Sequence, residues 1–320
     1  MLVDHPSPAR RVLDKAGTND PILTIAIPTY RREAMLVEAL TSALQQDTTL
    51  PIEIIVVDND PASEAKALSS VDLNTSTHAV RYYINDSNVG MLGNWNQCIA
   101  LARGKWITLL HDDDWLAPGF VSAMLRLVMQ GYDFAVCRVK VGSSNFKPEI
   151  LRRTRDTDDI EILTVDDLIF GNPTPAPGLL ILKEALAATG GFDPAAYPCA
   201  DYVTYARCAT NVRSGRLNRT LAYYRTTDSQ TFKEDTLWKI IQQSNEIKLR
   251  LLRVAPKAST ATYILSMAFW FRLASAHGIP LIDIQMDWRL KCARILSRSR
   301  LITLPLELIR KSIKYLHPHN

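Results

Sequence analysis

Residues 106–115 read Trp-Ile-Thr-Leu-Leu-His-Asp-Asp-Asp-Trp. A run typical of a buried strand leads into three carboxylates, Asp112, Asp113 and Asp114, and a helical pattern begins at Pro118. Neighbouring carboxylates about 4 Å apart repel by roughly 4 kcal/mol at an effective dielectric near 20. Three of them at one strand end therefore call for a cation, or for protonation of one carboxyl. With oxygen ligands and no nearby cysteine, the stretch predicts a Mg²⁺ or Mn²⁺ site that binds a diphosphate.

Strand and helix patterns alternate on either side of this stretch. Apolar, β-rich runs predict strands at residues 22–27, 53–57, 80–84, 105–110 and 133–141, and helical periodicity occurs at 32–46, 91–102 and 118–130. Strands joined by helices of this length imply right-handed crossovers and a mainly parallel sheet. The expected fold class is therefore α/β, a Rossmann-like, mostly parallel sheet flanked by helices.

The rest of the chain predicts fewer regular elements, followed by a helical extension. A polar loop at 143–161 is expected to be a mobile flap, with strands at 179–182 and 221–224 and a helix from about Asp201. From about residue 234 the pattern is wholly helical. The predicted organisation is a flexible segment at 1–20, a catalytic domain at 21–232 and a basic α-helical C-terminal extension at 233–320.

Polar residues follow three of the predicted strands directly. They are Thr29-Tyr30-Arg31 after Pro28, Asp58-Asn59-Asp60, and the three carboxylates. Ligands of parallel sheets lie at the carboxyl ends of the strands, so these groups are expected to share one pocket. Tyr30 could stack on a base, and Asp58 and Asn59 could hydrogen-bond a pyrimidine edge or a ribose. Taken alone, Asp-Asn-Asp after a strand is ordinary turn chemistry.

The charge is unevenly distributed. The chain has a net charge of +4, yet residues 233–320 carry fifteen Lys and Arg against six Asp and Glu. A basic helical extension could dock on an anionic membrane surface, or simply pack against an acidic catalytic half. The same two alternatives apply to an amphipathic stripe that begins at Pro305.

The cysteines and the hydropathy pattern bear on the compartment. The five cysteines include no CxxC pair, which argues against a disulfide framework and a zinc site and favours a reducing compartment. Residues 1–20 lack an apolar signal core, and the most apolar stretch, 263–276, is too short to span a bilayer. A cytoplasmic protein is expected, peripheral at the membrane face if the extension docks there.

Together these motifs resemble glycosyltransferase family 2, whose members are inverting enzymes with a GT-A fold. The resemblance covers about residues 22–230, and its combination of motifs is specific although each alone is weak. The matching elements, in chain order, are Pro28-Thr29-Tyr30-Arg31-Arg32 for P-T-Y-N-R, Val56-Val57-Asp58-Asn59 for V-D-D/N, Asn88, Gly90, Asn96, Ala102 and Gly104 for N-x-G…N…A-x-G, His111-Asp112-Asp113-Asp114 for D-x-D-D, Gly190-Gly191-Phe192-Asp193 for G-G-F-D, and Asp201 with Arg207 for E-D…R.

The resemblance implies roles for individual residues. Asp113 and Asp114 would bind Mn²⁺ or Mg²⁺, with Asp112, His111 and Asp228 as weaker candidates. The donor would lie against residues from the three strand ends and the second helix, namely Pro28, Thr29, Tyr30, Arg31, Asp58, Asn59, Asn96 and Asp112. Asp201 would be the base that takes the proton from the acceptor hydroxyl. The sequence departs from the family at Arg31 (usually Asn), His111 (usually Asp) and Ala200 (usually Glu).

The resemblance therefore implies a metal-dependent inverting glycosyltransferase. Its donor would be a sugar on UDP or dTDP, its acceptor a lipid-linked saccharide in bacterial surface-polysaccharide synthesis, and no nucleic-acid partner is expected. Two alternatives stay open. One is a non-catalytic subunit that binds a nucleotide sugar or serves assembly, although the intact acidic triad argues against it. The other is a nucleotidyltransferase. Such an enzyme would typically have a glycine-rich phosphate-binding loop after the first strand, and residues 28–32 contain no glycine.

Overall fold

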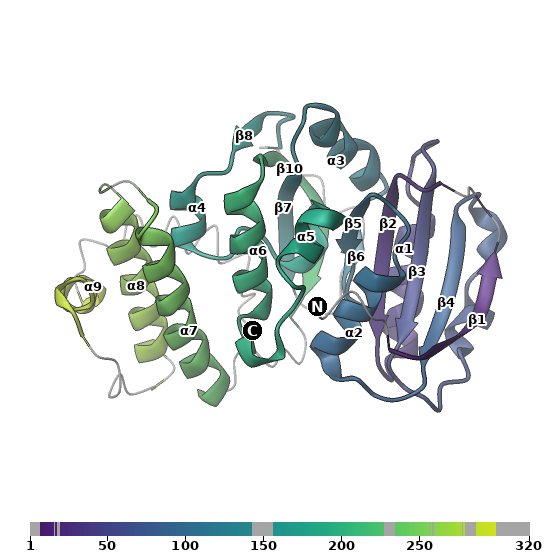
Figure 1. Cartoon of the computed structure of the whole chain (residues 1–320), viewed down its shortest axis with the longest axis horizontal. Helices are drawn as coiled ribbons and strands as arrows, with labels where there is room; N and C mark the ends of the chain where they lie inside the picture. Colours follow the sequence, from purple (N-terminus) through teal and green to yellow (C-terminus); the bar gives the residue numbers. More distant parts are fainter. Residues whose placement is uncertain are drawn as a thin grey trace.

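A computed structural model describes residues 7–15, 17, 20–142, 156–226, 234–255, 257, 259–276, 278 and 286–298. Within these ranges the strands form one ten-stranded sheet with helices on both faces (Figure 1). The strand order is β1-β4-β3-β2-β5-β9-β7-β10-β6, and β8 pairs with β10 off this path. The α/β class expected from the sequence is confirmed.

The parallel half of the sheet holds the strands that the apolar runs predict. They are β2 (Leu23–Thr29), β3 (Ile52–Asp58), β4 (Ala79–Asn85) and β5 (Trp106–Leu109). Neighbouring pairs in the order β4-β3-β2-β5 are all parallel. Every residue of these four strands is buried, because helices cover both faces. The carboxyl ends of β2, β3 and β5 therefore meet at one edge of the sheet.

The other half of the sheet is mixed. It contains β6 (Trp115–Leu116), β7 (Phe134–Gly142), β9 (Leu179–Leu182) and β10 (Ser214–Arg225). Strand β9 is antiparallel to both β5 and β7, whereas β10 is parallel to β7. The mainly parallel prediction thus holds for the half that carries the acidic loop, and the sheet as a whole is mixed.

Two hydrophobic cores lie on the two faces of the sheet. The helices α1 (Glu33–Leu44) and α3 (Phe120–Met129) cover one face. The other face is covered by α2 (Gly90–Leu101), α4 (Val165–Phe170), α5 (Lys183–Ala188) and α6 (Ala200–Asn211). Short 3₁₀ turns occur at Lys66–Ser70, Leu73–Thr75, Ala176–Gly178 and Pro194–Ala196.

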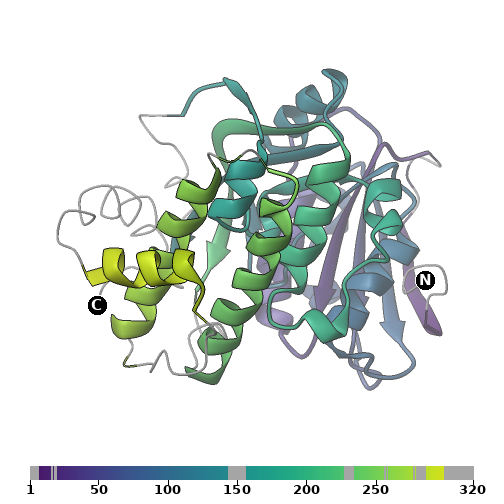
Figure 2. The ribbon, with the colours of Figure 1, turned by 60° about the vertical axis from the view of Figure 1, so that its left-hand side comes forward.

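The C-terminal helices extend the second of these cores. They are α7 (Glu234–Leu252), α8 (Ser259–Ala276) and α9 (Trp288–Arg298). Buried residues of α7 and α8, among them Ile241, Tyr263 and Met267, belong to the same apolar cluster as α4 and α6. Figures 1 and 2 show α7 and α8 beside α4 and α6, with α9 across the outer side of α8. In the part of the chain that is described, no helix has the length and apolar character needed to cross a membrane.

Two segments differ from the sequence-based expectation. Residues 9–15, expected to be part of a flexible segment, form β1 (Ala9–Lys15), which pairs antiparallel with β4. The predicted flap at 143–161 ends in β8 (Ile160–Ile162), antiparallel to β10, and 143–155 lie outside the described residues. Both strands pair with a neighbouring strand through backbone hydrogen bonds and bury few apolar side chains. Hydrophobic periodicity in the sequence therefore could not reveal them. The stripe after Pro305 also lies outside the described residues.

Candidate functional site

The acidic loop after β5 lies beside the carboxyl end of β2. Three different partners hold its three carboxylates. Asp112 accepts a hydrogen bond from the Thr29 hydroxyl at 2.8 Å, and Asp114 accepts one from the backbone N–H of Arg225 at 2.9 Å. Asp113 lies 2.7 Å from the Arg32 guanidinium. The loop is therefore fixed by the ends of β2 and β10 and by the residue before α1.

These carboxylates are short of positive charge. Burial raises the pKa of Asp112 to about 6. Burial, together with the neighbouring charge of Asp113, raises the pKa of Asp114 well above its ordinary value. Carboxyl groups in this state gain most from a bound cation, which supplies the charge that their surroundings lack.

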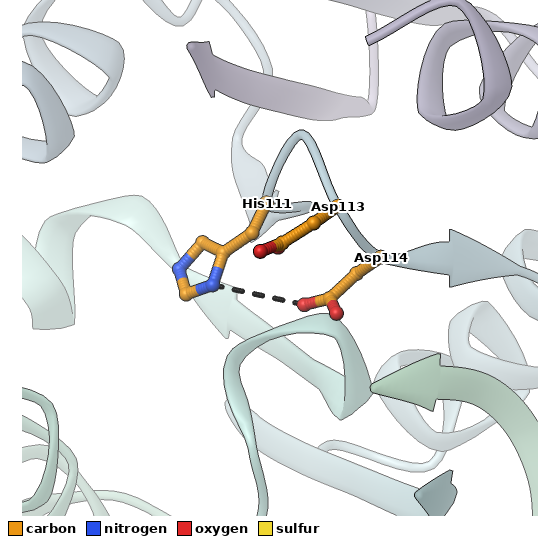
Figure 3. A group of neighbouring side chains, drawn as sticks. All are labelled: His111, Asp113 and Asp114. Atoms are coloured by element: carbon orange, nitrogen blue, oxygen red, sulfur yellow. Dashed lines mark ion pairs between the residues drawn. The ribbon is translucent and has the colours of Figure 1, made fainter. Parts of the chain in front are cut away.

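A potential metal-binding group is formed by His111, Asp113 and Asp114 (Figure 3). One ligand atom from each of the three lies within 4.8 Å of the others. His111 Nδ1 lies 3.6 Å from the Asp114 carboxylate, and its ring stacks on Trp95 with centroids 4.8 Å apart. Among the described residues, neither His111 Nε2 nor Asp114 Oδ2 has a hydrogen-bond partner, although both atoms are buried. The donor set, and the two buried atoms that lack a hydrogen-bond partner, fit a divalent cation.

The geometry changes the order of the predicted ligands. His111, a weaker candidate in the sequence, joins Asp113 and Asp114, whereas Asp112 faces Thr29 and Arg32 outside the group. Asp228 lies outside the described residues. Burial lowers the pKa of His111, which keeps its imidazole neutral and able to bind a metal.

Two arginines for which the sequence motifs predict no role in the site lie at this loop. Arg32 pairs with both Asp112, at 3.3 Å, and Asp113. Arg225, at the end of β10, pairs with Glu38 of α1 while its backbone binds Asp114. Arg32 was visible as the last residue of the quoted 28–32 motif, whereas the Arg225–Glu38 pair joins residues too far apart in the chain to be predicted.

The loop after β2 presents an aromatic surface. The Tyr30 side chain is exposed, and the Arg31 guanidinium lies 4.9 Å from its ring centroid. Arg31 has φ of +56°, a left-handed conformation in which Asn is enriched and Arg is uncommon. A 2.7 Å ion pair with Asp60 anchors it there. Tyr30 is thus available for stacking, whereas Pro28 is buried inside β2.

The end of β3 supplies a buried carboxylate. Asp58 accepts hydrogen bonds from the Tyr82 hydroxyl at 2.8 Å and from the backbone of Asp60 at 3.0 Å. Each contact occupies one carboxylate oxygen, which leaves further lone pairs for a ligand.

Two residues predicted to bind the nucleotide-sugar donor, Asn59 and Asn96, instead hydrogen-bond other protein groups. The Asn59 amide donates to Asn88 and to the Gly90 carbonyl, and accepts from Asn85 and from the backbone of Val89. These four hydrogen bonds use both donors and both acceptor sites of the Asn59 amide. In this conformation Asn59 therefore holds the 85–90 loop and has no group left to hydrogen-bond a base.

Asn96 is also turned toward the protein. Its amide both donates to the carbonyl of Phe192 and accepts from the N–H of the same residue, at 2.9 and 2.8 Å. It therefore ties α2 to the Gly190–Asp193 turn. Sequence alone could not distinguish these inward-facing amides from ligand-binding ones, because both occur next to strand ends or helices near the site.

Asp201 lies in the first turn of α6. Its carboxylate accepts hydrogen bonds from the Asn172 amide at 2.8 Å and from the backbone N–H of Tyr202 at 2.7 Å. The end of α6 leads into the start of β10, so α6 begins toward the edge of the sheet where β10 ends (Figure 1). Burial raises the pKa of Asp201, as a general base that works near neutral pH requires.

Comparison with protein families adds an independent observation. The model of glycosyl transferase family 2 matches residues 24–176. A GalNAc(5)-diNAcBac-PP-undecaprenol beta-1,3-glucosyltransferase of Campylobacter jejuni is 31% identical over 113 residues, 35% of this chain and 36% of the relative. The succinoglycan biosynthesis protein ExoO of Rhizobium meliloti is 32% identical over 124 residues, 38% and 34% of the two chains. The match thus spans about a third of the length of each relative.

Solved structures show the same fold over most of the chain. S. aureus TarS 1-349 in complex with UDP-GlcNAc has a TM-score of 0.57 at 14% identity, covering 90% of this chain and 92% of that one. The mannosyltransferase PcManGT of Pyrobaculum calidifontis, in complex with GDP-Man and Mn²⁺, has a TM-score of 0.52 at 15% identity, covering 93% and 86%. A coverage of 90% extends beyond the sheet, which ends at Arg225, into the C-terminal helical part of the chain.

Proposed function

Because the chain belongs to glycosyltransferase family 2, we propose that it transfers a sugar from a nucleoside diphosphate to a saccharide hydroxyl with inversion. The observation that carries this proposal is the His111–Asp113–Asp114 group at the carboxyl edge of the sheet. Glycosyl transfer to a hydroxyl needs a cation for the diphosphate, a surface for the nucleoside and a base for the acceptor, and each has a candidate here.

The donor would bind across the ends of β2, β3 and β5. Tyr30 would stack on the base, and Asp58 and Asp112 would accept hydrogen bonds from the base or the ribose. UDP or dTDP is the proposed carrier, a choice supported by the TarS complex with UDP-GlcNAc, although the PcManGT complex contains GDP-Man. A bound cation would replace Arg32 as the positive partner of Asp113, and the Arg32 guanidinium would then bind the diphosphate.

His111, Asp113 and Asp114 would hold the cation, which when bound offsets the negative charge that develops on the leaving diphosphate. A nitrogen ligand suits Mn²⁺ better than Mg²⁺, which prefers an all-oxygen octahedron. The Mn²⁺ in the PcManGT complex supports this choice. Mn²⁺ is therefore the proposed cofactor, with Mg²⁺ as the alternative.

Asp201 would accept the proton of the acceptor hydroxyl as its oxygen attacks the anomeric carbon. Attack from the face opposite the departing diphosphate inverts that carbon in a single displacement. A raised pKa makes this carboxylate a better base, while its two hydrogen bonds keep it ionised and oriented.

A lipid-linked acceptor at a membrane surface is the proposed setting, in bacterial polysaccharide synthesis on the cytoplasmic face. The names of the two curated relatives, one with undecaprenol and one with succinoglycan biosynthesis, support it. The outer side of α9 adds a physical argument. Trp288 and Ile295 are 59% and 69% exposed, Lys291 and Arg298 lie on the same side, and α9 contains no acidic residue.

A thermal-shift screen with nucleoside diphosphates and nucleotide sugars tests the proposal directly. A ligand at 100 times its Kd stabilises the folded state by about 2.7 kcal/mol. We expect stabilisation by a uridine or thymidine diphosphate that depends on Mn²⁺, and loss of that dependence in Asp113→Ala. Asp201→Asn should keep donor binding and lose sugar transfer. Binding without transfer by the wild type, across acceptor libraries, would instead favour a non-catalytic subunit.

A further inference from the structure

Helices α7 and α8 contact the two segments that meet at Asp201. One is the stretch before α6, which leads into Asp201. The other is the end of α4 together with the loop after it, which carries Asn172. Helix α4 contacts both α7 and α8 extensively, and Figure 2 shows these two helices against this side of the domain.

Gln243 of α7 bridges the segment before Asp201. Its Nε2 donates to the carbonyl of Tyr197 at 2.9 Å, and its Oε1 accepts from the N–H of Cys199 at 3.2 Å. The Cys199 thiol also reaches the backbone of Ile240, one turn earlier on α7, with sulfur and oxygen 3.8 Å apart. The backbone two residues before Asp201 is therefore fixed by an amide on the extension.

Ser266 of α8 holds the segment before Asn172. Its hydroxyl donates to the carbonyl of Phe170 at 2.6 Å. Lys248 of α7, whose side chain is fully buried, donates to the same hydroxyl at 2.8 Å. This chain of contacts orients a backbone two residues before the amide that binds the Asp201 carboxylate.

We propose that Asn172 is a positioning residue for Asp201, and that Gln243 and Ser266 of the C-terminal helices hold this pair in its working geometry. The C-terminal helices thereby form part of the base's support. The inference rests on the proposed role of Asp201 as the base. It concerns residues outside the 24–176 family match except for Asn172 itself.

Within the part of the chain that the structure describes, two titratable groups interact with the Asp201 carboxylate, the Cys199 thiol and the Tyr205 phenol. Burial raises the pKa of the Cys199 thiol to about 12 and raises the pKa of the Tyr205 phenol well above its ordinary value, so both groups are neutral near pH 7. Lys248 interacts with the Cys199 thiol, and burial lowers the pKa of Lys248 to about 7. The Asn172 donor and the Tyr202 N–H therefore provide the main stabilisation of ionised Asp201.

The first test measures Asp201 itself in the full-length protein. Side-chain carboxyl carbons of ¹³C-labelled aspartate are titrated by NMR, and Asp201→Asn identifies the resonance. Asn172→Ala should raise the Asp201 pKa by about one unit, because a hydrogen bond to the charged form is lost. Asn172→Asp, which replaces the donor by a second carboxyl, should raise it further. An unchanged titration would overturn the proposal, whatever the activity.

The second test uses turnover. Asn172→Ala and Gln243→Ala should lower kcat by about tenfold or more with little change in the KM for the donor, because orientation of a catalytic group is lost. The acidic limb of the kcat profile should move to higher pH in Asn172→Ala. Gln242→Ala is the matched control, a half-buried neighbour on the same helix.

The outcomes separate this inference from the proposed function. If the wild type transfers sugar, and both Asn172→Ala and Gln243→Ala have a normal kcat and pH profile, the inference is wrong and the proposed function is unaffected. Absence of transfer by the wild type would refute the function, while the NMR titration still decides whether Asn172 controls Asp201. Equal losses in Gln243→Ala and Gln242→Ala would overturn the assignment of Gln243, because a general weakening of α7 would explain both.

Discussion

The Arg32 guanidinium lies 2.7 Å from the carboxylate of Asp113 and 3.3 Å from that of Asp112. In the ligand-free protein this side chain supplies positive charge to a group of carboxylates that is otherwise self-repelling. A divalent cation bound at Asp113 would compete with Arg32 for the same oxygen atoms. Arg32 is about half exposed, so it can swing away at little cost.

Removal of this competition should strengthen metal binding. We expect Arg32→Gln to raise the affinity of the nucleotide-free protein for Mn²⁺ by up to about tenfold, since the uncompensated carboxylates attract the cation more strongly. Isothermal titration calorimetry measures the change. Arg31→Gln is the control, because Arg31 pairs with Asp60 instead. Equal or weaker binding in Arg32→Gln would mean that Arg32 does not compete with the metal.

The identity of the first acidic-motif residue should decide the choice of metal. His111→Asp replaces nitrogen by oxygen, and we expect the ratio of Mn²⁺ to Mg²⁺ affinity to fall by about tenfold. His111→Ala should weaken both ions. Thermal shifts at graded concentrations of each ion give the two affinities. Asp60→Asn, which alters a carboxylate outside the group, should change neither affinity, and an unaltered ratio in His111→Asp would remove His111 from the ligands.

Most of the candidate site at the carboxyl ends of β2, β3 and β5 could be predicted, because it depends on local sequence. Apolar runs that end in polar residues mark strand ends, and parallel pairing brings those ends together. Thr29, Asp58 and the acidic loop therefore lie where the sequence predicts. The short edge strands β1, β6 and β8 could not be predicted in this way, since backbone pairing with a neighbour defines them and their side chains carry no strong pattern.

Long-range side-chain contacts limited the prediction of the site. Asn59 and Asn96 have the side-chain type and the sequence positions expected of ligand-binding residues. Their amides nevertheless hydrogen-bond protein partners. Asn172, which binds Asp201, has no motif around it because its role depends on where α4 ends relative to α6. Contacts of this kind depend on tertiary packing, which residue type and spacing do not encode locally.

Lys248 should make stability depend on pH. Burial lowers its pKa from 10.5 to about 7 in the folded protein. Between these values the unfolded chain binds a proton that the folded protein does not, so this residue makes stability rise with pH, by at most about 1.4 kcal/mol per unit. Below pH 7 the buried charge destabilises the fold to its full extent.

Denaturant unfolding at pH 7 and pH 9 tests this expectation. The increase in unfolding free energy between these values should be smaller in Lys248→Met than in the wild type. Lys239→Met, which replaces an exposed lysine of the same helix, should retain the wild-type increase. An equal increase in Lys248→Met would indicate that Lys248 remains protonated in the folded protein throughout.

The outer side of α9 should contact an anionic bilayer. Trp288 and Ile295 lie two turns apart on the exposed side, opposite the buried Leu290 and Ala293. An indole and an aliphatic side chain can enter the lipid interface while neighbouring lysine and arginine contact the headgroups. We therefore expect full-length protein to cosediment with vesicles that contain phosphatidylglycerol, and less so with phosphatidylcholine alone.

Variants of α9 separate the apolar and the electrostatic parts of this binding. The double variant Trp288→Ser/Ile295→Ser should lower the vesicle partition coefficient by about tenfold or more, since two buried apolar side chains each contribute roughly 1.5–3 kcal/mol. Salt should weaken binding of the wild type, because the headgroup attraction is screened. Met129→Ala, which removes an 84% exposed apolar side chain from α3, is the control. Equal partitioning of all three proteins would exclude α9 as the contact, and binding that ignores lipid charge would exclude its basic residues from the interaction.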